Sequence, residues 1–280
     1  MNIVKNIALR IVQRLLLNLN LRLDSMSSFV AQTTSSIGAL GAADALSHYT
    51  KNYEVLSHDK DLRDFMRFYS NNFSKSSSQW SQDIFVIYAS KEKRFGLFLE
   101  IGGADGFTHS NTYSLEQHYE WQGTLIEPDR SQFSLLKALR SNNSLINAAI
   151  SPGDKEETLN LRCVGQLSAL QGHEGEDMHI ETRLNSRRIA QVKCVSLSKI
   201  LCENNFDYFS LDVEGAELAI LRNIKWNSIN KPSIITVEHN FREEDKREML
   251  ALLTAQGYSE RFAGHDWLRR GDIWATLQKS

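Results

Sequence analysis

Two acidic residues lie in and just before a glycine-rich turn, and they are the first candidates for chemistry in this sequence. The segment reads Phe98-Leu-Glu-Ile-Gly-Gly-Ala-Asp-Gly-Phe107, so an apolar run passes Glu100 and ends in a turn that carries Asp105. A short apolar run bounded by glycines is typical of a strand covered on both faces. We therefore expect a nucleotide-type cofactor at the end of a parallel strand, although a tight turn without a ligand uses the same residue types.

The glycines of this turn indicate which kind of cofactor it suits. Gly102, Gly103 and Gly106 allow a tight turn and a close approach of the backbone to a ligand. Their spacing departs from the G-x-G-x-x-G pattern of dinucleotide-binding proteins, and acids at this place would repel a pyrophosphate. A cofactor with a cationic centre and no phosphates, such as S-adenosylmethionine, fits the charge better.

A second short apolar strand ends at Glu127, in the segment Gly123-Thr-Leu-Ile-Glu-Pro-Asp129. An acid about twenty residues beyond the glycine turn is where a carboxylate binds a ribose diol. Glu127 is therefore the expected ribose ligand. The alternative is a solvated strand end followed by a helix that Pro128 and Asp129 open and that runs to Leu139.

Further acids follow the apolar strand Phe206 to Leu211, in the order Asp212, Glu214 and Glu217. Open parallel sheets bind ligands at the carboxyl edge of their strands, so Asp212 is expected to face the methyl donor or an acceptor hydroxyl. Glu214 and Glu217 begin the next helix, where carboxylates also favour the positive end of the helix dipole. Helix capping therefore competes with catalysis as their explanation.

The strand Ile234 to Val237 delivers Glu238 and His239 to the same edge. S-adenosylmethionine donates its methyl group by in-line displacement, so with this cofactor an alcohol acceptor gains from losing its proton as it attacks. Histidine is the usual base near neutral pH, which makes His239 the first candidate for that role. Glu238 could orient His239 or bind acceptor hydroxyls. A histidine that is only hydrogen-bonded at a strand end is the alternative, and His109 is expected to support the turn or line the pocket.

Taken together, these segments resemble the FkbM-type S-adenosylmethionine-dependent methyltransferases over roughly Gln79 to Thr276. The matching blocks are Glu100-Ile-Gly-Gly-Ala-Asp-Gly106, Ser110-Asn-Thr-Tyr-Ser-Leu-Glu116, Trp121-x-Gly123, Ile126-Glu-Pro128, Asn147-Ala-Ala149 and Asp212-Val-Glu-Gly-Ala-Glu217. The resemblance implies a Rossmann-like domain, S-adenosylmethionine as cofactor, and O-methyl transfer to a sugar or another small hydroxylated or carboxylated product.

Site residues can then be assigned to the two halves of such a pocket. The expected acceptor and catalytic residues are His239, Asp212 and Glu238. The expected cofactor-binding residues are Glu100, Gly102, Gly103, Asp105, Gly106, Ser110, Asn111, Glu127, Asn147, Ala148 and Asp212. Asn147 to Ala149 would lie near the adenine, where small side chains leave room for a flat ring, and Ser110 can also cap the first crossover helix.

The elements that must position these residues alternate as a doubly wound α/β sheet requires. Residues 79–280 are expected to form the methyltransferase domain, and residues 1–78 a helical N-terminal extension and linker. Leu145 to Ile150 is expected to be the third strand. Tyr258 to Phe262 and Ile273 to Leu277 are expected to pair as an antiparallel C-terminal edge of a mostly parallel sheet, after a helix from Glu243 to Gln256.

The segment Gly165 to Arg188 interrupts this alternation, because it is polar and rich in charge and histidine. A long irregular segment is usually a lid or a disordered insertion, and we expect a substrate-covering flap here. Its acids and histidines match no closed coordination set, so we expect no metal. These residues are His173, Glu174, Glu176, Asp177 and His179.

Composition narrows the class of partner and compartment. A net charge of −2 gives no support for nucleic-acid binding, and three cysteines without a C-x-x-C pair favour a reducing cytoplasm. Apolar residues from Ile3 to Leu19 recur at helical spacing with basic residues between them. This amphipathic helix is expected to pack on the catalytic domain or a second subunit, with a membrane interface as the alternative.

The sequence thus favours an S-adenosylmethionine-dependent O-methyltransferase that acts on a small-molecule acceptor such as a sugar, glycan or natural product. The competing enzyme class is a nicotinamide-dependent oxidoreductase on the same type of sheet. A non-catalytic cofactor-binding scaffold that kept the fold is the alternative from another class.

Overall fold

The computed structural model describes residues 37–174 and 179–278 of the chain. The expected amphipathic helix at Ile3 to Leu19 lies outside these residues. The described chain begins with helices: α3 (Ile37–Lys51), α4 (Tyr53–Leu56), α5 (Lys60–Asn72), the short 3-10 helix η1 (Phe73–Lys75) and α6 (Gln82–Ala89). Asp59 caps α5 because its carboxylate accepts the backbone N–H of Leu62 at 3.0 Å.

Within the described residues, the main sheet has seven strands in the order β10-β11-β9-β8-β1-β2-β3. Their bounds are β1 (Leu97–Ile101), β2 (Gln122–Ile126), β3 (Ser144–Ile146), β8 (Tyr208–Leu211), β9 (Ile234–Glu238), β10 (Tyr258–Glu260) and β11 (Asp272–Leu277). The neighbours from β9 to β3 pair in parallel, whereas β11 runs antiparallel to both β9 and β10. The expected Rossmann-like doubly wound sheet with an antiparallel C-terminal edge is confirmed.

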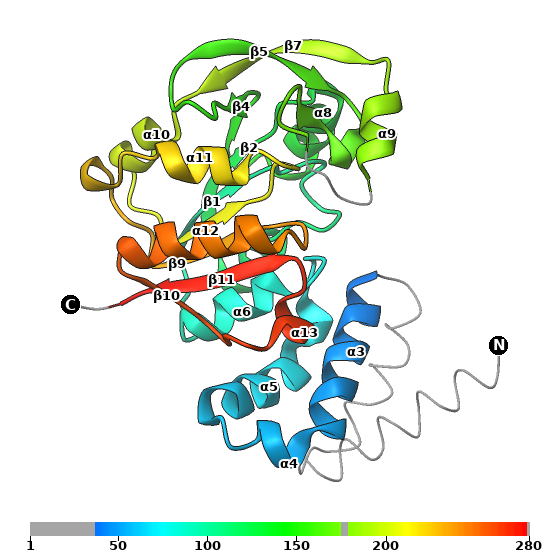
Figure 1. Cartoon of the computed structure of the whole chain (residues 1–280), viewed down its shortest axis with the longest axis vertical. Coiled ribbons are helices and arrows are strands. Elements are labelled where there is room, and N and C mark those ends of the chain that lie inside the picture. Colours follow the sequence, from blue (N-terminus) through cyan, green and yellow to red (C-terminus); the bar gives the residue numbers. More distant parts are fainter. Residues whose placement is uncertain (1–36, 175–178, 279–280) are drawn as a thin grey trace, which may run out of the picture.

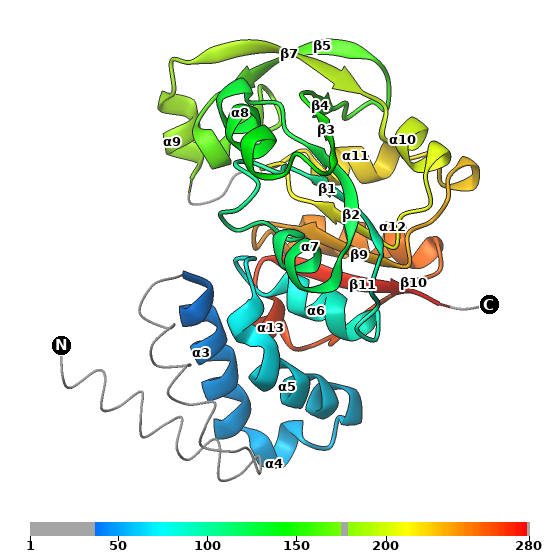
Figure 2. The same cartoon turned by 180° about the vertical axis from the view of Figure 1, so that it is seen from behind.

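Helices cover both faces of this sheet (Figures 1 and 2). One face carries α10 (Leu197–Glu203), α11 (Glu217–Asn223) and α12 (Glu243–Ala255); the other carries α6, α7 (Tyr113–Tyr119) and α8 (Arg130–Leu139). Successive strand residues point to opposite faces, so Phe98 packs in one core and Leu99 in the other. Both faces of the strands are therefore buried, as their continuous apolar sequence predicts.

A smaller sheet has the order β4-β7-β5-β6 and lies at the top of Figure 1. Its strands are β4 (Ala149–Ile150), β5 (Glu157–Arg162), β6 (Ala169–Leu170) and β7 (Ile189–Val195). The expected third strand at Leu145 to Ile150 is corrected, because its two ends join different sheets: β3 pairs with β2 and β4 pairs with β7.

The polar segment Gly165 to Arg188 is less irregular than the sequence predicts. Its described part contains η2 (Gly165–Leu167), the strand β6 of the smaller sheet, and α9 (Ile180–Asn185). Arg183 of α9 is fully buried and donates to the backbone carbonyl of Leu167 at 3.1 Å. Residues 175–178, which include Glu176 and Asp177, lie outside the described residues.

The N-terminal helices share a core with the sheet. Phe65 of α5 packs against Phe262 and Trp274, with ring centroids 4.7 and 6.1 Å apart, and Phe85 of α6 stacks on Trp274 at 4.8 Å. In the first turn of α6, the Asp83 carboxylate accepts hydrogen bonds from Ser76, Ser77 and Ser78 and so holds the linker between α5 and α6 against the domain.

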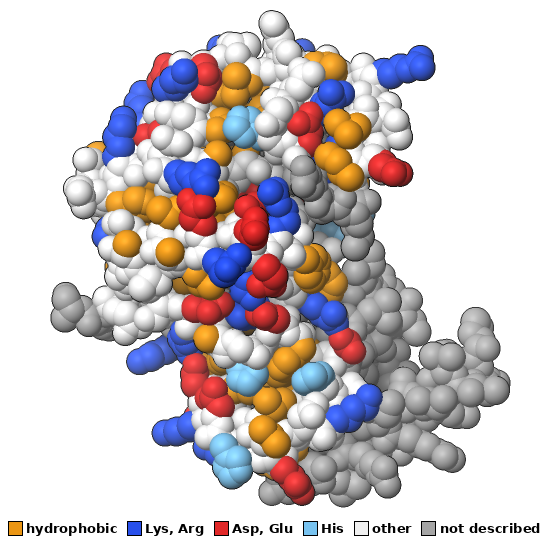
Figure 3. All heavy atoms as spheres, in the orientation of Figure 1, with side chains coloured by type: hydrophobic (Ala, Val, Ile, Leu, Met, Phe, Trp, Pro, Cys, Tyr) orange, Lys and Arg blue, Asp and Glu red, His pale blue; other side chains and the backbone are white. Residues whose placement is uncertain are grey.

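Acidic and basic side chains are intermixed on the face of the molecule that carries α11 and α12 (Figure 3). There Arg222 of α11 forms a two-point ion pair with Glu248 of α12 at 2.5 and 2.6 Å. A short helix, α13 (Asp266–Arg269), precedes β11. In the part of the chain that the structure describes, every helix is too short or too polar to cross a membrane.

Candidate active site

A cavity of about 830 Å³ opens at the carboxyl edge of the central strands. The residues that follow β1, β2, β8 and β9 form its floor, and the smaller sheet with η2 forms one wall. The linker before α6 closes another side. Ligands bind at this edge of open parallel sheets, and the volume lies in the range of known small-molecule sites.

The glycine turn after β1 is shaped by the neighbouring strand. Gly102 has a φ of +87°, and a Cβ built there would overlap the backbone carbonyl oxygen of Asp212 after β8. Gly103 and Gly106 lie against α8, and Gly106 has a φ of +82°. Glycine at 102 thus allows the ends of β1 and β8 to meet and brings Asp212 next to the turn.

Glu127 lines the cavity at the end of β2, with 5% of its surface exposed. One carboxylate oxygen accepts the backbone N–H of Ala104 at 2.9 Å, and the other accepts that of Asp129 at 2.7 Å. Burial raises the pKa of Glu127 to about 8, although the two backbone donors oppose the shift. Each oxygen keeps a lone pair, which is what a diol needs from a carboxylate.

Glu100 and its partners support the turn from behind. The buried Glu100 carboxylate accepts hydrogen bonds from the Ser110 hydroxyl, the Asn111 backbone N–H and the Thr112 hydroxyl. Burial raises the pKa of Glu100, with Arg140 opposing the shift. The Glu100 carboxylate therefore interacts with the protein itself, and its expected contact with the cofactor stays a prediction.

Some of the other expected cofactor residues line the cavity, and others contact only the protein. Asp105 accepts hydrogen bonds from Phe107 and Thr108 within its own turn. The Asn147 side chain donates to the backbone carbonyl of Glu127 at 2.8 Å. Asp105 thus stabilises the turn, and Asn147 stabilises the backbone at Glu127. The expected residues that line the cavity are Gly102, Gly103, Ser110, Glu127, Ala148 and Asp212, whereas Glu100, Asp105, Gly106, Asn111 and Asn147 lie outside its lining.

Asp212 and Glu238 form a carboxyl pair on the cavity floor, at the ends of the adjacent strands β8 and β9. Their carboxylate oxygens lie within 4.8 Å of each other. Each side chain has a raised pKa: burial is the largest cause for both, and the charge of Asp212 raises the pKa of Glu238 further. Asp272 of β11 is a third buried acid of this region, and burial also raises its pKa well above the usual range. A pair of carboxyls this close retains a proton that neither would keep alone.

Glu217 and Glu214 differ in their roles. The Glu217 carboxylate accepts the backbone N–H groups of Val213 and Gly215 at 2.8 and 2.9 Å and so shapes the loop after β8. Glu214 lines the cavity and pairs with the buried Arg183. Among the described residues, Asp212, Glu217 and Glu238 form a group whose carboxylate oxygens lie within 4.8 Å of one another.

The expected base His239 is not part of the cavity lining. Strand residues alternate in direction, so the residue after Glu238 points away from Glu238. His239 is 3% exposed, and its ring nitrogens have no hydrogen-bond partner among the described residues. Burial, with the charges of Lys246 and Arg269, lowers its pKa to about 4. This placement does not support His239 as the base, whereas the carboxyl groups of Asp212 and Glu238 line the cavity.

Several lining residues have no role in the sequence-based assignment. Gln79 and Trp80 come from the linker before α6, while Asn240 and Phe241 follow β9 with φ values of +50° and +59°. Position after a strand end was a usable signal for Asn240 and Phe241. Trp80 had no such signal, because its place in the wall depends on how the helical extension packs.

The mostly parallel sheet, with a cavity at the carboxyl edge of its central strands, defines a Rossmann-like domain. The chain belongs to the FkbM methyltransferase family: the model of the methyltransferase FkbM domain matches residues 100–260. As a member of this family, the protein uses S-adenosylmethionine as its cofactor.

Solved structures of methyltransferases share low sequence identity with the chain. The methyltransferase FkbM of Methylobacillus flagellatus is 12% identical, with a TM-score of 0.43, over 83% of this chain and 60% of that protein. A TehB-like S-adenosylmethionine-dependent methyltransferase of Corynebacterium glutamicum is 9% identical, with a TM-score of 0.40, over 80% of this chain and 99% of that one. The chain thus spans 60% of the length of the Methylobacillus protein. No curated protein matches the chain.

The cavity residues fit this cofactor. The Glu127 carboxylate keeps lone pairs beside the cavity, and the small side chains of Ala148 and Ala149 leave room for a flat ring. The acids Asp212 and Glu238 suit a cationic sulfonium centre. The ends of β1 and β2 can therefore hold the donor.

Proposed function

We propose that the protein transfers a methyl group from S-adenosylmethionine to a hydroxyl oxygen of a small, uncharged, ring-containing acceptor. The observation that carries this proposal is the Asp212–Glu238 carboxyl pair, which lines the same cavity as Glu127. When bound, the cofactor supplies an electrophilic methyl group on a positively charged sulfur.

The acid pair supplies the base for such a reaction. An attacking hydroxyl must lose its proton as the new bond forms, and a base works best when its pKa lies near the working pH. The raised pKa values of Asp212 and Glu238 move this carboxyl pair toward that range. One ionised carboxylate of the pair accepts the hydroxyl proton, and its partner stabilises the shared charge by hydrogen bonding.

The charge and shape of the cavity favour a particular acceptor. A carboxylate acceptor would be repelled by Asp212 and Glu238, so a hydroxyl acceptor is favoured over a carboxyl one. Arg242 in the same wall is paired with Asp245 at 3.2 Å, so its charge is already balanced. Trp80 and Phe241 supply aromatic surface for a ring face, while the carboxyls bind hydroxyls.

The test is methyl transfer to a panel of neutral sugars, polyols and phenols, followed as formation of S-adenosylhomocysteine. We expect turnover with at least one class, and a loss of about 100-fold or more in kcat for Asp212→Asn and Glu238→Gln. The affinity for S-adenosylhomocysteine, measured by calorimetry, is expected to change little in both variants, because the glycine turn and Glu127 are unchanged.

His239→Gln is the matched control, since it removes the neighbouring titratable group outside the cavity. A large loss of kcat in this variant with full activity in the two acid variants would contradict the proposal. Binding of S-adenosylhomocysteine without transfer to any acceptor would favour the non-catalytic scaffold. Tight binding of NAD alone would favour the nicotinamide-dependent oxidoreductase.

A further inference from the structure

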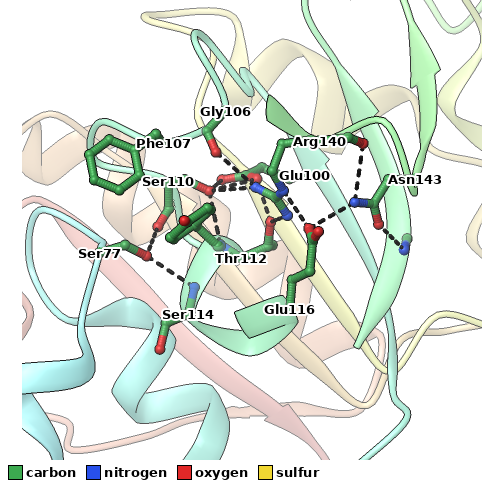
Figure 4. Close-up of polar contacts among 12 residues, drawn as sticks. Ser77, Glu100, Gly106, Phe107, Ser110, Thr112, Ser114, Glu116, Arg140 and Asn143 are labelled. Atoms are coloured by element: carbon green, nitrogen blue, oxygen red, sulfur yellow. Dashed lines mark hydrogen bonds and ion pairs between the residues drawn. The ribbon is translucent and has the colours of Figure 1, made fainter. Parts of the chain in front are cut away.

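A buried arginine lies behind the cofactor turn, on the side away from the cavity. Arg140 is fully buried, follows the last residue of α8 and is not in the cavity lining. Figure 4 shows its guanidinium group pointing between the turn at Gly106 and the start of α7. Because burial of an unpaired charge is costly, the contacts of Arg140 indicate what the protein gains from it.

Two hydroxyl groups connect Arg140 to the equally buried Glu100. The Ser110 hydroxyl donates to Glu100 at 3.1 Å and accepts from Arg140 at 3.2 Å. The Thr112 hydroxyl donates to Glu100 at 2.6 Å and accepts from Arg140 at 3.0 Å. Each hydroxyl therefore has a fixed orientation between opposite charges, and such charge-assisted bonds are stronger than neutral ones.

The same guanidinium also binds the turn directly. Arg140 donates to the backbone carbonyl of Gly106 at 3.0 Å. Its flat face lies over the rings of Phe98 and Tyr113, each 5.6 Å from the ring centroid. One side chain thus connects the end of the glycine turn with Ser110, which lines the cavity further along the same loop, after Thr108 and His109.

The outer end of the arginine is fixed by a separate set of contacts. Arg140 forms an ion pair with Glu116 of α7, and the Asn143 side chain donates to the same carboxylate at 2.8 Å. Asn143 in turn accepts the backbone N–H of Gly123 at the start of β2. These contacts stabilise α7, α8 and β2 without touching the turn, so the two ends of Arg140 can be tested separately.

We infer that Arg140, acting through the Ser110 and Thr112 hydroxyls, is a positioning residue that sets the affinity for the cofactor. It holds the loop from Gly102 to Ser110 in the conformation that the donor binds, although it does not touch the donor. An ordered loop needs no rearrangement on binding, so its ordering cost is already met in the free protein. The inference concerns the cofactor half of the cavity and does not depend on the acceptor.

The test compares variants at the two ends of this network by calorimetric titration with S-adenosylhomocysteine. Thr112→Val removes one bridging hydroxyl at nearly constant volume, and Arg140→Lys keeps the charge but loses the planar arrangement of donors. We expect each to raise the Kd for S-adenosylhomocysteine about tenfold, the effect of losing one or two buried hydrogen bonds. Glu116→Gln is the matched control, because it weakens the outer end alone, and its Kd is expected to stay within about twofold.

Thermal unfolding and circular dichroism of each free variant separate binding from stability. The expected result is a weaker affinity in Thr112→Val and Arg140→Lys, with Glu116→Gln destabilised yet normal in affinity. The inference is overturned if Thr112→Val and Arg140→Lys bind S-adenosylhomocysteine as tightly as the natural protein. It is equally overturned if Glu116→Gln loses affinity in proportion to its stability, since the network would then act only on folding.

Discussion

The Glu127 carboxylate is buried beside the cavity and, among the described residues, accepts two backbone N–H groups. Burial penalises its charged form more than these donors stabilise it, which raises its pKa to about 8. Glu127 is therefore largely protonated near neutral pH in the cofactor-free protein. Two ribose hydroxyls would donate to the ionised form, so cofactor binding and deprotonation of Glu127 should be linked.

This linkage predicts a pH-dependent affinity. From pH 6 to pH 8, the Kd for S-adenosylhomocysteine should fall by up to about tenfold per unit and then level off above the pKa of Glu127. Calorimetric titrations at several pH values measure the effect. Glu127→Gln should bind more weakly and with a much flatter profile. An unchanged slope in Glu127→Gln would assign the pH dependence to another group.

We expect the Asp212–Glu238 pair to increase activity and to lower the stability of the folded protein. Acids whose pKa is raised by folding bind more protons in the folded protein than in the unfolded one above about pH 4, so the free energy of unfolding decreases as the pH rises through the raised values. Replacing one acid of the pair by its amide removes this decrease in the free energy of unfolding.

At pH 8 and without cofactor, Asp212→Asn and Glu238→Gln should therefore raise Tm by roughly 2–5 °C while they lower kcat. Differential scanning fluorimetry at pH 6 and pH 8 tests this, and the gain should shrink at the lower pH. Glu244→Gln changes an acid whose side chain is 92% exposed and should leave Tm unchanged. A lower Tm in both pair variants would count against a strained acid pair.

At the level of the secondary-structure elements, the site depends on how closely the carboxyl ends of β1 and β8 approach each other. Gly102 has a φ of +87° and lies against the Asp212 carbonyl, whereas Gly172 has a φ of +84° with nothing within 4 Å of a built Cβ. The two glycines thus share a backbone conformation and differ in the space around them. That pair separates the cost of the conformation from the cost of the contact.

Gly102→Ala should lower the free energy of unfolding by more than about 3 kcal/mol, because the strand ends must move apart. Gly172→Ala should cost only about 1–2 kcal/mol, the price of a left-handed alanine. Urea denaturation of both variants gives the comparison. Equal losses would mean that the β1–β8 contact can relax freely.

Elements with a strong local sequence pattern could be predicted. Elements whose bounds depend on contacts with residues far away in the sequence could not. The apolar strands ending at Ile101, Ile126 and Leu211 and the acids after them could be read from sequence, since a strand buried on both faces is a continuous apolar run. The split between β3 and β4 depends on the pairing of Ile150 with Val195, which no local pattern records. The direction of His239 likewise follows from strand register, which the sequence alone did not fix.

For the whole molecule, the helical extension and the sheet have one continuous core. Phe65 of α5 is fully buried against Phe262 and Trp274, across the expected domain boundary at residue 78. That boundary stays a prediction, but these contacts imply that the described helices of residues 37–78 unfold together with the sheet. These helices are then part of the folding unit that holds the cavity.

Phe65→Ala should therefore destabilise the entire chain by about 3–5 kcal/mol in a single transition. Chemical denaturation followed by circular dichroism and by tryptophan fluorescence should give coincident curves. Phe95→Ala removes a ring that is 73% exposed and should cost no more than about 0.5 kcal/mol. Two separated transitions in Phe65→Ala would show that the extension unfolds independently.

Trp80 gives the molecule a built-in optical reporter. Among the described residues, which include all five tryptophans, Trp80 is the one that lines the cavity, and Trp121, Trp226 and Trp274 are buried in the cores. Its ring lies 5.4 Å from the Arg270 guanidinium, which is paired with Asp44 of α3. The emission of this indole should respond when the cavity fills and when α3 shifts, so a single unlabelled sample can report on both events.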